Sequence, residues 1–257
     1  MKIAVLVKEV PDSYGERKLD TTTGLADRGA SDRVIDEITA RAVEAAVSYA
    51  DSAQDAEVVL VTMGPESAES MLRKTLAMGA DSACHISDEA LTGADLGLSA
   101  EVLAAALRRI GFDLVIAGDV SSDGTGGLLP TMLAQRLGVA HLTSLDSAQI
   151  SETEVSGERG TYGGTVSLRA DLPAVVSVTE RMPDPRFPGF KGIMSAKKKP
   201  LETLTAADLG VDAQADVPRS IMLSVTQAPA RTAGTKVTDE GEAGTQLADY
   251  LAEKRLV

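Results

Sequence analysis

Short apolar runs, rich in β-branched residues, recur along the first half of the chain. They occupy residues 3–7, 58–62 and 114–117, and polar or turn-forming residues bound each of them. Strands that are buried on both faces of a parallel sheet read as continuous apolar runs rather than as alternating ones. Each run therefore predicts a central parallel strand.

Alanine-rich segments with apolar residues at helical spacing separate these runs. They cover residues 36–49, 67–78 and 95–110, and Gly79 and Gly111 directly follow the last two, where glycine commonly ends a helix. Strands that alternate with helices predict βαβ units with right-handed crossovers. The predicted fold class is α/β, with a doubly wound, mainly parallel sheet.

The second half of the chain departs from this alternation. Residues 144–164 are polar and predict a hairpin with its turn near Gly163 and Gly164, and residues 172–178 restore a buried strand. A last helix is predicted over residues 242–254, with an apolar stripe. Such a helix cannot bury its stripe alone, so we expect it to pack on its own domain or, as we favour, on a partner.

Aromatic residues gather in segment 186–202. The chain has only three Phe and no Trp, yet Phe187 and Phe190 both lie here, and a run of three lysines follows. The Pro-Gly pair between the two rings argues against a helix and predicts a projecting turn. Apolar side chains on such a turn are typical of a docking surface. The alternative is that both rings fold back onto the core, with the lysines as a solvated face.

Composition narrows the classes of function. The formal charge of −13 argues against nucleic acid as a partner, because phosphate backbones are bound through excess Lys and Arg. Cys84 is the only cysteine, which precludes an internal disulfide and fits a reducing compartment. The early charge in the first strand argues against a signal peptide, and no apolar stretch approaches the roughly 18 residues that cross a bilayer. We therefore expect a cytoplasmic protein.

The strongest candidate for a ligand site is the glycine-rich stretch 117–130. It follows a buried strand and precedes a helix predicted over residues 131–137, where ligands of open α/β sheets bind. Gly124, Gly126 and Gly127 allow a close approach of the backbone, while Ser122, Thr125 and free N–H groups suit phosphate oxygens. Neither the dinucleotide fingerprint nor the Walker motif is present. A phosphate site is favoured over a plain turn.

The sequence contains few patterns that are typical of a catalytic site. His85 and His141 lack a nearby Ser or Asp pattern, and Cys84 and His85 point to opposite faces if they share a strand. No cluster of His, Cys, Asp and Glu has the spacing of metal ligands. We predict no catalytic residue and no metal site, so binding or carrying is favoured over turnover.

Seven short motifs, in one order, resemble the beta subunit of electron transfer flavoproteins over roughly residues 1–237. They are VKEVPD at 7–12, TLAMGAD at 75–81, GDVSSDGTG at 118–126, LPAVV at 172–176, IMSAKKKP at 193–200, DLGV at 208–211 and RTAG at 231–234. The resemblance implies a Rossmann-like sheet of the adenine nucleotide alpha hydrolase type and an electron carrier rather than an enzyme.

The resemblance also implies two cofactors. An alpha subunit would hold most of an FAD, and this chain would carry a structural AMP and cover one side of the flavin. Flavin-side contacts would come from Ser13, Tyr14 and Ile38. Where this chain has Asp36-Glu37, relatives with AMP often have Asn-Pro. The AMP positions carry over to Leu6, Asp36, Glu37, Ile38, Thr39, Met63, Asp123, Gly124 and Thr125, to which the glycine-rich stretch adds Ser122 and Gly126.

The implied partners are the alpha subunit, dehydrogenases that deliver electrons (typically acyl-CoA dehydrogenases), and a quinone oxidoreductase that receives them. Similar loops insert one apolar anchor into the dehydrogenase, and Phe190 stands at that place. The implied division is a nucleotide-binding domain at 1–185, a recognition loop at 186–202, and an arm and helix at 203–257 that pack on the alpha subunit. The partner-binding residues are Phe187, Phe190, Ile193, Met194, Lys197, Lys198 and Lys199.

Two alternatives remain. A stand-alone adenine-nucleotide sensor that resembles universal stress proteins would have no use for residues 186–257. Some electron-bifurcating relatives bind a second FAD in place of AMP, but they carry a longer turn where this chain reads SDGTGG. AMP is therefore favoured. A family glutamate has no counterpart at the corresponding position, Gly160.

Overall fold

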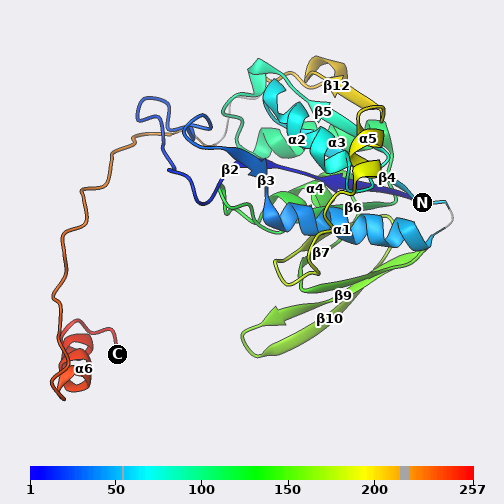
Figure 1. The fold of residues 1–257 in the computed structure, drawn as a ribbon. Coiled ribbons are helices and arrows are strands. Elements are labelled where there is room, and N and C mark those ends of the chain that lie inside the picture. Colours follow the sequence, from blue (N-terminus) through cyan, green and yellow to red (C-terminus); the bar gives the residue numbers. More distant parts are fainter. Residues whose placement is uncertain (54, 215–219, 221) are drawn as a thin grey trace. The chain divides into compact units, whose positions relative to one another are not determined.

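A seven-stranded parallel sheet forms the centre of residues 1–223 (Figure 1). The computed structural model describes residues 1–53, 55–214, 220 and 222–257. The strand order is β12-β5-β4-β1-β6-β11-β7, and every neighbouring pair is parallel. The strands are β1 (Lys2–Leu6), β4 (Glu57–Met63), β5 (Ser82–Ile86), β6 (Leu114–Gly118), β7 (Ala140–Leu145), β11 (Ala174–Val178) and β12 (Leu201–Leu204).

Helices cover both faces of this sheet. One core packs alternate strand residues such as Ile3 and Val5 against α1 and α2, and the other packs Ala4 and Val115 against α3 and α4. Both faces are apolar, which explains the continuous hydrophobic runs in the sequence. The helices are α1 (Glu37–Ser52), α2 (Glu69–Leu76), α3 (Leu96–Ile110), α4 (Leu129–Leu137), α5 (Phe190–Ala196) and α6 (Ala243–Glu253), with short 3-10 turns at Glu66–Ala68, Glu89–Leu91 and Ala207–Leu209.

Two smaller antiparallel sheets adjoin the central one. Strands β8 (Ser147–Ile150), β9 (Glu154–Thr161) and β10 (Gly164–Asp171) form the first, and the turn between β9 and β10 lies at Tyr162-Gly163. The second pairs β2 (Glu9–Pro11) with β3 (Arg33–Ile35) and so projects residues 12–32 as one long loop.

The α/β class, the doubly wound parallel sheet and the hairpin are confirmed. The prediction of a turn without a helix around Phe190 is wrong, because α5 begins at that residue. Gly189 has an extended backbone as the N-cap of α5, so the Pro-Gly pair precedes the helix and does not interrupt it. Gly192, inside α5, is packed so closely that an added Cβ would lie 2.4 Å from the carbonyl oxygen of Ala77.

The described residues divide into two compact units, 1–223 and 224–257. Strand β12 pairs with β5, so the first unit includes residues that the sequence analysis grouped with the C-terminal arm. Helix α6 is the regular element of the second unit, and none of its residues is buried. In the part of the chain that the structure describes, no helix is both long and apolar enough to span a membrane.

Candidate functional site

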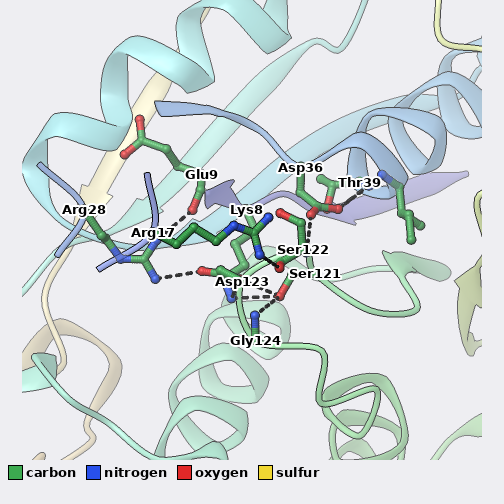
Figure 2. A network of polar contacts seen from close by, with 11 residues as sticks. Lys8, Glu9, Arg17, Arg28, Asp36, Thr39, Ser121, Ser122, Asp123 and Gly124 are labelled. Atoms are coloured by element: carbon green, nitrogen blue, oxygen red, sulfur yellow. Dashed lines mark hydrogen bonds and ion pairs between the residues drawn. The ribbon is translucent and has the colours of Figure 1, made fainter. Parts of the chain in front are cut away.

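The glycine-rich stretch lies at the topological switch point of the sheet. Strand β1 has β4 on one side and β6 on the other, and the chain leaves β1 and β6 towards opposite sides of the sheet. Open α/β sheets bind ligands at the carboxyl ends of such a pair of strands. Here those ends carry Lys8 and residues 119–127, and α1 begins beside them (Figure 2).

Asp36 connects the start of α1 to the glycine-rich stretch. One carboxylate oxygen, Oδ1, accepts hydrogen bonds from the backbone N–H groups of Ile38 (3.2 Å) and Thr39 (3.3 Å), and Oδ2 accepts one from the N–H of Ser122 (2.8 Å). Asp36 is 2% exposed. Gly118 permits this approach, since a Cβ there would lie 3.2 Å from the backbone nitrogen of Thr39.

Asp123 is the centre of a charged cluster in Figure 2. Its carboxylate accepts hydrogen bonds from Lys8 Nζ (2.7 Å), Arg28 Nη2 (3.0 Å) and Ser121 Oγ (2.7 Å). Burial raises the pKa of Asp123, but the hydrogen bonds from Lys8 and Ser121, the charge of Lys8 and the hydrogen bond from Arg28 outweigh it and lower this pKa to about 2. The carboxylate is therefore ionised at neutral pH and holds two cations beside the glycine-rich stretch.

The low pKa of Asp123 predicts an acid dependence of stability. Since this pKa of about 2 is below the ordinary value of 3.8, the ionised group stabilises the folded chain fully above about pH 4, and the contribution is lost as the pH falls towards 2. We expect Asp123→Asn to lower the free energy of unfolding by about 1–3 kcal/mol near neutral pH, with a smaller difference at about pH 2.5. Urea unfolding between about pH 2.5 and neutral pH measures this difference in the free energy of unfolding. Asp171→Asn, at an exposed residue, is the control. A difference that does not vary with pH would contradict the assignment.

Four polar residues of this cluster were not among the predicted site residues, although Ser121 lies within the predicted stretch 117–130: Lys8, Arg17, Arg28 and Ser121. Arg17 Nη1 donates to the carbonyl oxygen of Ser122 (2.7 Å), and the Ser121 hydroxyl accepts from both Lys8 Nζ (3.0 Å) and the N–H of Gly124 (3.2 Å). Lys8 directly follows a buried strand and could have been found on that ground. Arg17 and Arg28 lie in the long 12–32 loop, whose sequence has no periodicity that places it over the sheet.

The structure brings most of the predicted nucleotide residues together. Asp36, Glu37, Ile38 and Thr39 start α1 beside the stretch that contains Ser122, Asp123, Gly124, Thr125 and Gly126, and Thr125 adopts a left-handed backbone with φ of +48°. Two further predicted residues contribute side chains to the core, and their assignment to the nucleotide stays a prediction. Leu6 is buried against the α3 and α4 side of the sheet, and the half-buried Met63 packs on the same core.

The predicted flavin-side residues other than Ile38 lie on the 12–32 loop. Ser13 and Tyr14 are exposed, and the Tyr14 side chain is 99% exposed. Ile38 is half-buried at the start of α1 and packs against the adjoining core. The resemblance assigns these three residues to one side of the flavin, and that assignment stays a prediction.

The predicted docking residues lie in α5 and in the residues directly before and after it. Phe187 is 97% exposed and Phe190 81% exposed, so neither ring folds back onto the core. Ile193 and Met194 are each about half exposed, and Lys197 and Lys198 are exposed.

Lys199 differs from the two lysines before it. Its Nζ donates to the carbonyl oxygens of Leu76 (3.1 Å) and Ala80 (2.5 Å), and burial lowers the pKa of its amine. Lys199 therefore satisfies backbone oxygens at and just beyond the end of α2.

Comparison with known proteins agrees with this arrangement. Residues 23–209 match the model of the electron transfer flavoprotein domain, and the chain is 44% identical to the electron transfer flavoprotein subunit beta of Mycobacterium bovis over 99% of both chains. The chain belongs to the electron transfer flavoprotein beta-subunit family. Electron transfer flavoprotein beta subunits are electron carriers, and membership implies an alpha-subunit partner and a flavin in the complex.

Two other relatives show the range of this family. The electron transfer flavoprotein subunit beta of Bacillus subtilis is 30% identical and covers 98% of this chain and 96% of its own length. The subunit CarD of the caffeyl-CoA reductase-Etf complex of Acetobacterium woodii is 32% identical over all of both chains. Similar electron transfer flavoprotein chains thus work in differently named complexes.

Proposed function

We propose that this chain is the beta subunit of a heterodimeric electron transfer flavoprotein that binds AMP beside β1 and β6 and docks dehydrogenases through Phe187 and α5. The observation that carries the nucleotide assignment is the group of cations at the switch point of the sheet. Lys8, Arg17 and Arg28 all contact residues 121–123. Electrons would reach the shared FAD, held mostly by the alpha subunit, and continue to a quinone oxidoreductase.

The chemistry of the cluster suits a phosphate monoester. Three side-chain cations contact residues 121–123, whereas the carboxylates at these residues are those of Asp123 and Asp36, so the excess positive charge favours a bound anion. The start of α1 adds the positive end of a helix dipole, and the exposed Gly124 and Gly126 leave the backbone accessible. Asp36 already uses both oxygens within the protein, so the exposed carboxylate of Glu37 is the group at this end of α1 that is accessible to ribose hydroxyls.

The test is the nucleotide content of the native complex. The chain is co-expressed with its alpha subunit, the complex is purified and denatured, and released nucleotides are identified by mass spectrometry. We expect one AMP and one FAD per heterodimer. Two FAD and no AMP would favour the bifurcating alternative. A colourless monomer without nucleotide would refute the proposal.

Lys8 provides a sharper test of the phosphate contact. We expect Lys8→Met, which preserves much of the side-chain length and removes the charge, to weaken AMP binding about tenfold, since a hydrogen bond to a charged group contributes roughly 1.5–3 kcal/mol. Calorimetric titration of AMP into nucleotide-stripped heterodimer measures the affinity. Lys18→Met is the matched control, because Lys18 pairs with Glu16 on the 12–32 loop. Equal affinities for both variants would contradict the assignment.

The second unit fits a role in assembly. Leu247 and Tyr250 on α6 are 58% and 53% exposed, so the helix offers an apolar stripe that its own unit leaves uncovered. We propose that residues 224–257, the larger part of the arm predicted at 203–257, pack on the alpha subunit and that the complex works in the cytoplasm. A chain truncated before residue 224 would then fail to co-purify with the alpha subunit.

A further inference from the structure

Arg186 fixes the start of the docking segment to α1. Its guanidinium donates to both carboxylate oxygens of Glu44, from Nε (2.8 Å) and Nη2 (2.9 Å), and Nη1 donates to Asp51 (2.7 Å). The backbone N–H of Arg186 donates to Glu44 as well (2.9 Å), and Nη2 reaches the Ser48 hydroxyl (3.2 Å). Residues 44, 48 and 51 share one face of α1, so a single side chain binds two turns of the helix.

This contact is stronger than an ordinary surface ion pair. Exposed pairs contribute about 0–1 kcal/mol, because water screens them and both side chains lose freedom. The Glu44 side chain is only 14% exposed, and the pair is bidentate. Burial raises the pKa of Glu44, but the hydrogen bonds from Arg186 and Ser48 outweigh it and lower that pKa.

Other contacts fix both ends of the segment. On the α1 side, Arg41 binds Asp184 (2.8 Å) and donates to the carbonyl oxygen of Met182. On the α2 side, Arg73 Nη1 donates to the carbonyl oxygen of Lys199 (2.8 Å), which follows α5. Between these attachments, the Phe187 and Phe190 side chains are exposed, although the backbone that carries them is held at both ends.

We propose that Arg186 is a positioning residue, which holds Phe187 and Phe190 in place before a dehydrogenase arrives. The proposal rests on the docking role given above. Ordering a mobile loop on association lowers affinity, so a segment already fixed on α1 and α2 binds more tightly for the same contacts. Arg186 would thus act through the two rings and need not touch the partner itself.

We call the contacts of Arg186 with Glu44 and Asp51 the clamp. Hydrogen exchange followed by mass spectrometry tests the clamp without a dehydrogenase present. In the heterodimer, Arg186→Ala and Glu44→Gln should each accelerate exchange of the amides of residues 187–197 about tenfold, whereas α3 is unchanged. Arg186→Lys should behave similarly, because a lysine keeps the charge but not the bidentate geometry. Arg169→Ala, which removes the exposed pair with Glu154 on the β9–β10 hairpin, is the matched control. Unchanged exchange in the Arg186 variants would overturn the clamp.

Steady-state kinetics tests the consequence for docking. With an acyl-CoA dehydrogenase from the same genome and its acyl-CoA as reductant, Arg186→Ala should raise KM for the heterodimer about fivefold and leave kcat and flavin content unchanged. In a chain that already carries Phe187→Ala and Phe190→Ala, the Arg186→Ala substitution should have no further effect on KM. An equal effect in that background would overturn positioning through the rings. If the ring substitutions themselves leave KM unchanged, the docking role fails, and the exchange data alone decide the clamp.

Discussion

Phe190→Ala should lower the efficiency of electron acceptance from a docking dehydrogenase about 30-fold, almost entirely through KM. The ring is 81% exposed on a helix whose ends are held by α1 and α2, so it is free to enter a pocket on another protein. Truncating an aromatic anchor at the centre of an interface commonly costs about 2 kcal/mol or more, which is close to a 30-fold change. Reduction of the heterodimer by a dehydrogenase, followed at the flavin absorbance, gives kcat/KM directly.

Two controls separate docking from folding in this experiment. Tyr162→Ala removes another fully exposed aromatic ring, at the β9–β10 turn, and should leave kcat/KM unchanged. Flavin content and the flavin spectrum should be the same in both variants, because neither residue 190 nor residue 162 is among the predicted flavin-side residues Ser13, Tyr14 and Ile38. Loss of flavin in Phe190→Ala would show instead that the ring supports the assembly.

The sequence predicted the central architecture well because burial on both faces leaves a strong pattern. Continuous apolar runs located β1, β4 and β6 closely, helical spacing located α1, and helical spacing with a glycine stop located α3. Strand β12 was missed because its sequence, LETL, alternates in the manner of a surface segment, and its pairing with β5 depends on contacts distant in the chain. Helix α5 was missed because its single buried residue, Ala196, gives no periodic signal.

Some residues of the candidate site could likewise be predicted from the sequence, and others could not. The glycine-rich stretch and the Asp36 cap were recognisable, because each combines a turn or cap signal with a position after a strand or before a helix. Arg17 and Arg28 were not, since only the β2–β3 ribbon places their loop over that stretch. Leu6 and Met63 were proposed by resemblance; their side chains pack into the core, and their contact with the nucleotide stays a prediction. Local sequence signals locate the backbone features of a site. Charged side chains on a long loop can be assigned to the site only once the tertiary structure is known.

Asp36→Ala should release the nucleotide and also destabilise the fold. The substitution removes the acceptors for Ile38, Thr39 and the backbone N–H of Ser122, so α1 loses its cap and the glycine-rich stretch loses its tie to α1. Loss of a cap costs about 1 kcal/mol, and loss of the hydrogen bond from the Ser122 N–H to a charged group adds roughly 1.5 kcal/mol. We expect a loss of about 2–3 kcal/mol in the free energy of unfolding and little AMP in the purified heterodimer.

Asp88 supplies a matched control for this prediction. Its carboxylate caps the 3-10 turn Glu89–Leu91 through the N–H of Ala90 (2.9 Å) and accepts a hydrogen bond from the N–H of Ala206 (3.1 Å). Like Asp36, it therefore combines a cap with a link to a segment far along the chain. Asp88→Ala should therefore lower stability to a similar extent while AMP is retained. Chemical unfolding and mass spectrometry of released nucleotide, applied to both variants, separate the two effects. If Asp36→Ala retains as much AMP as Asp88→Ala, the link between α1 and Ser122 supports only the fold, and the nucleotide must bind elsewhere.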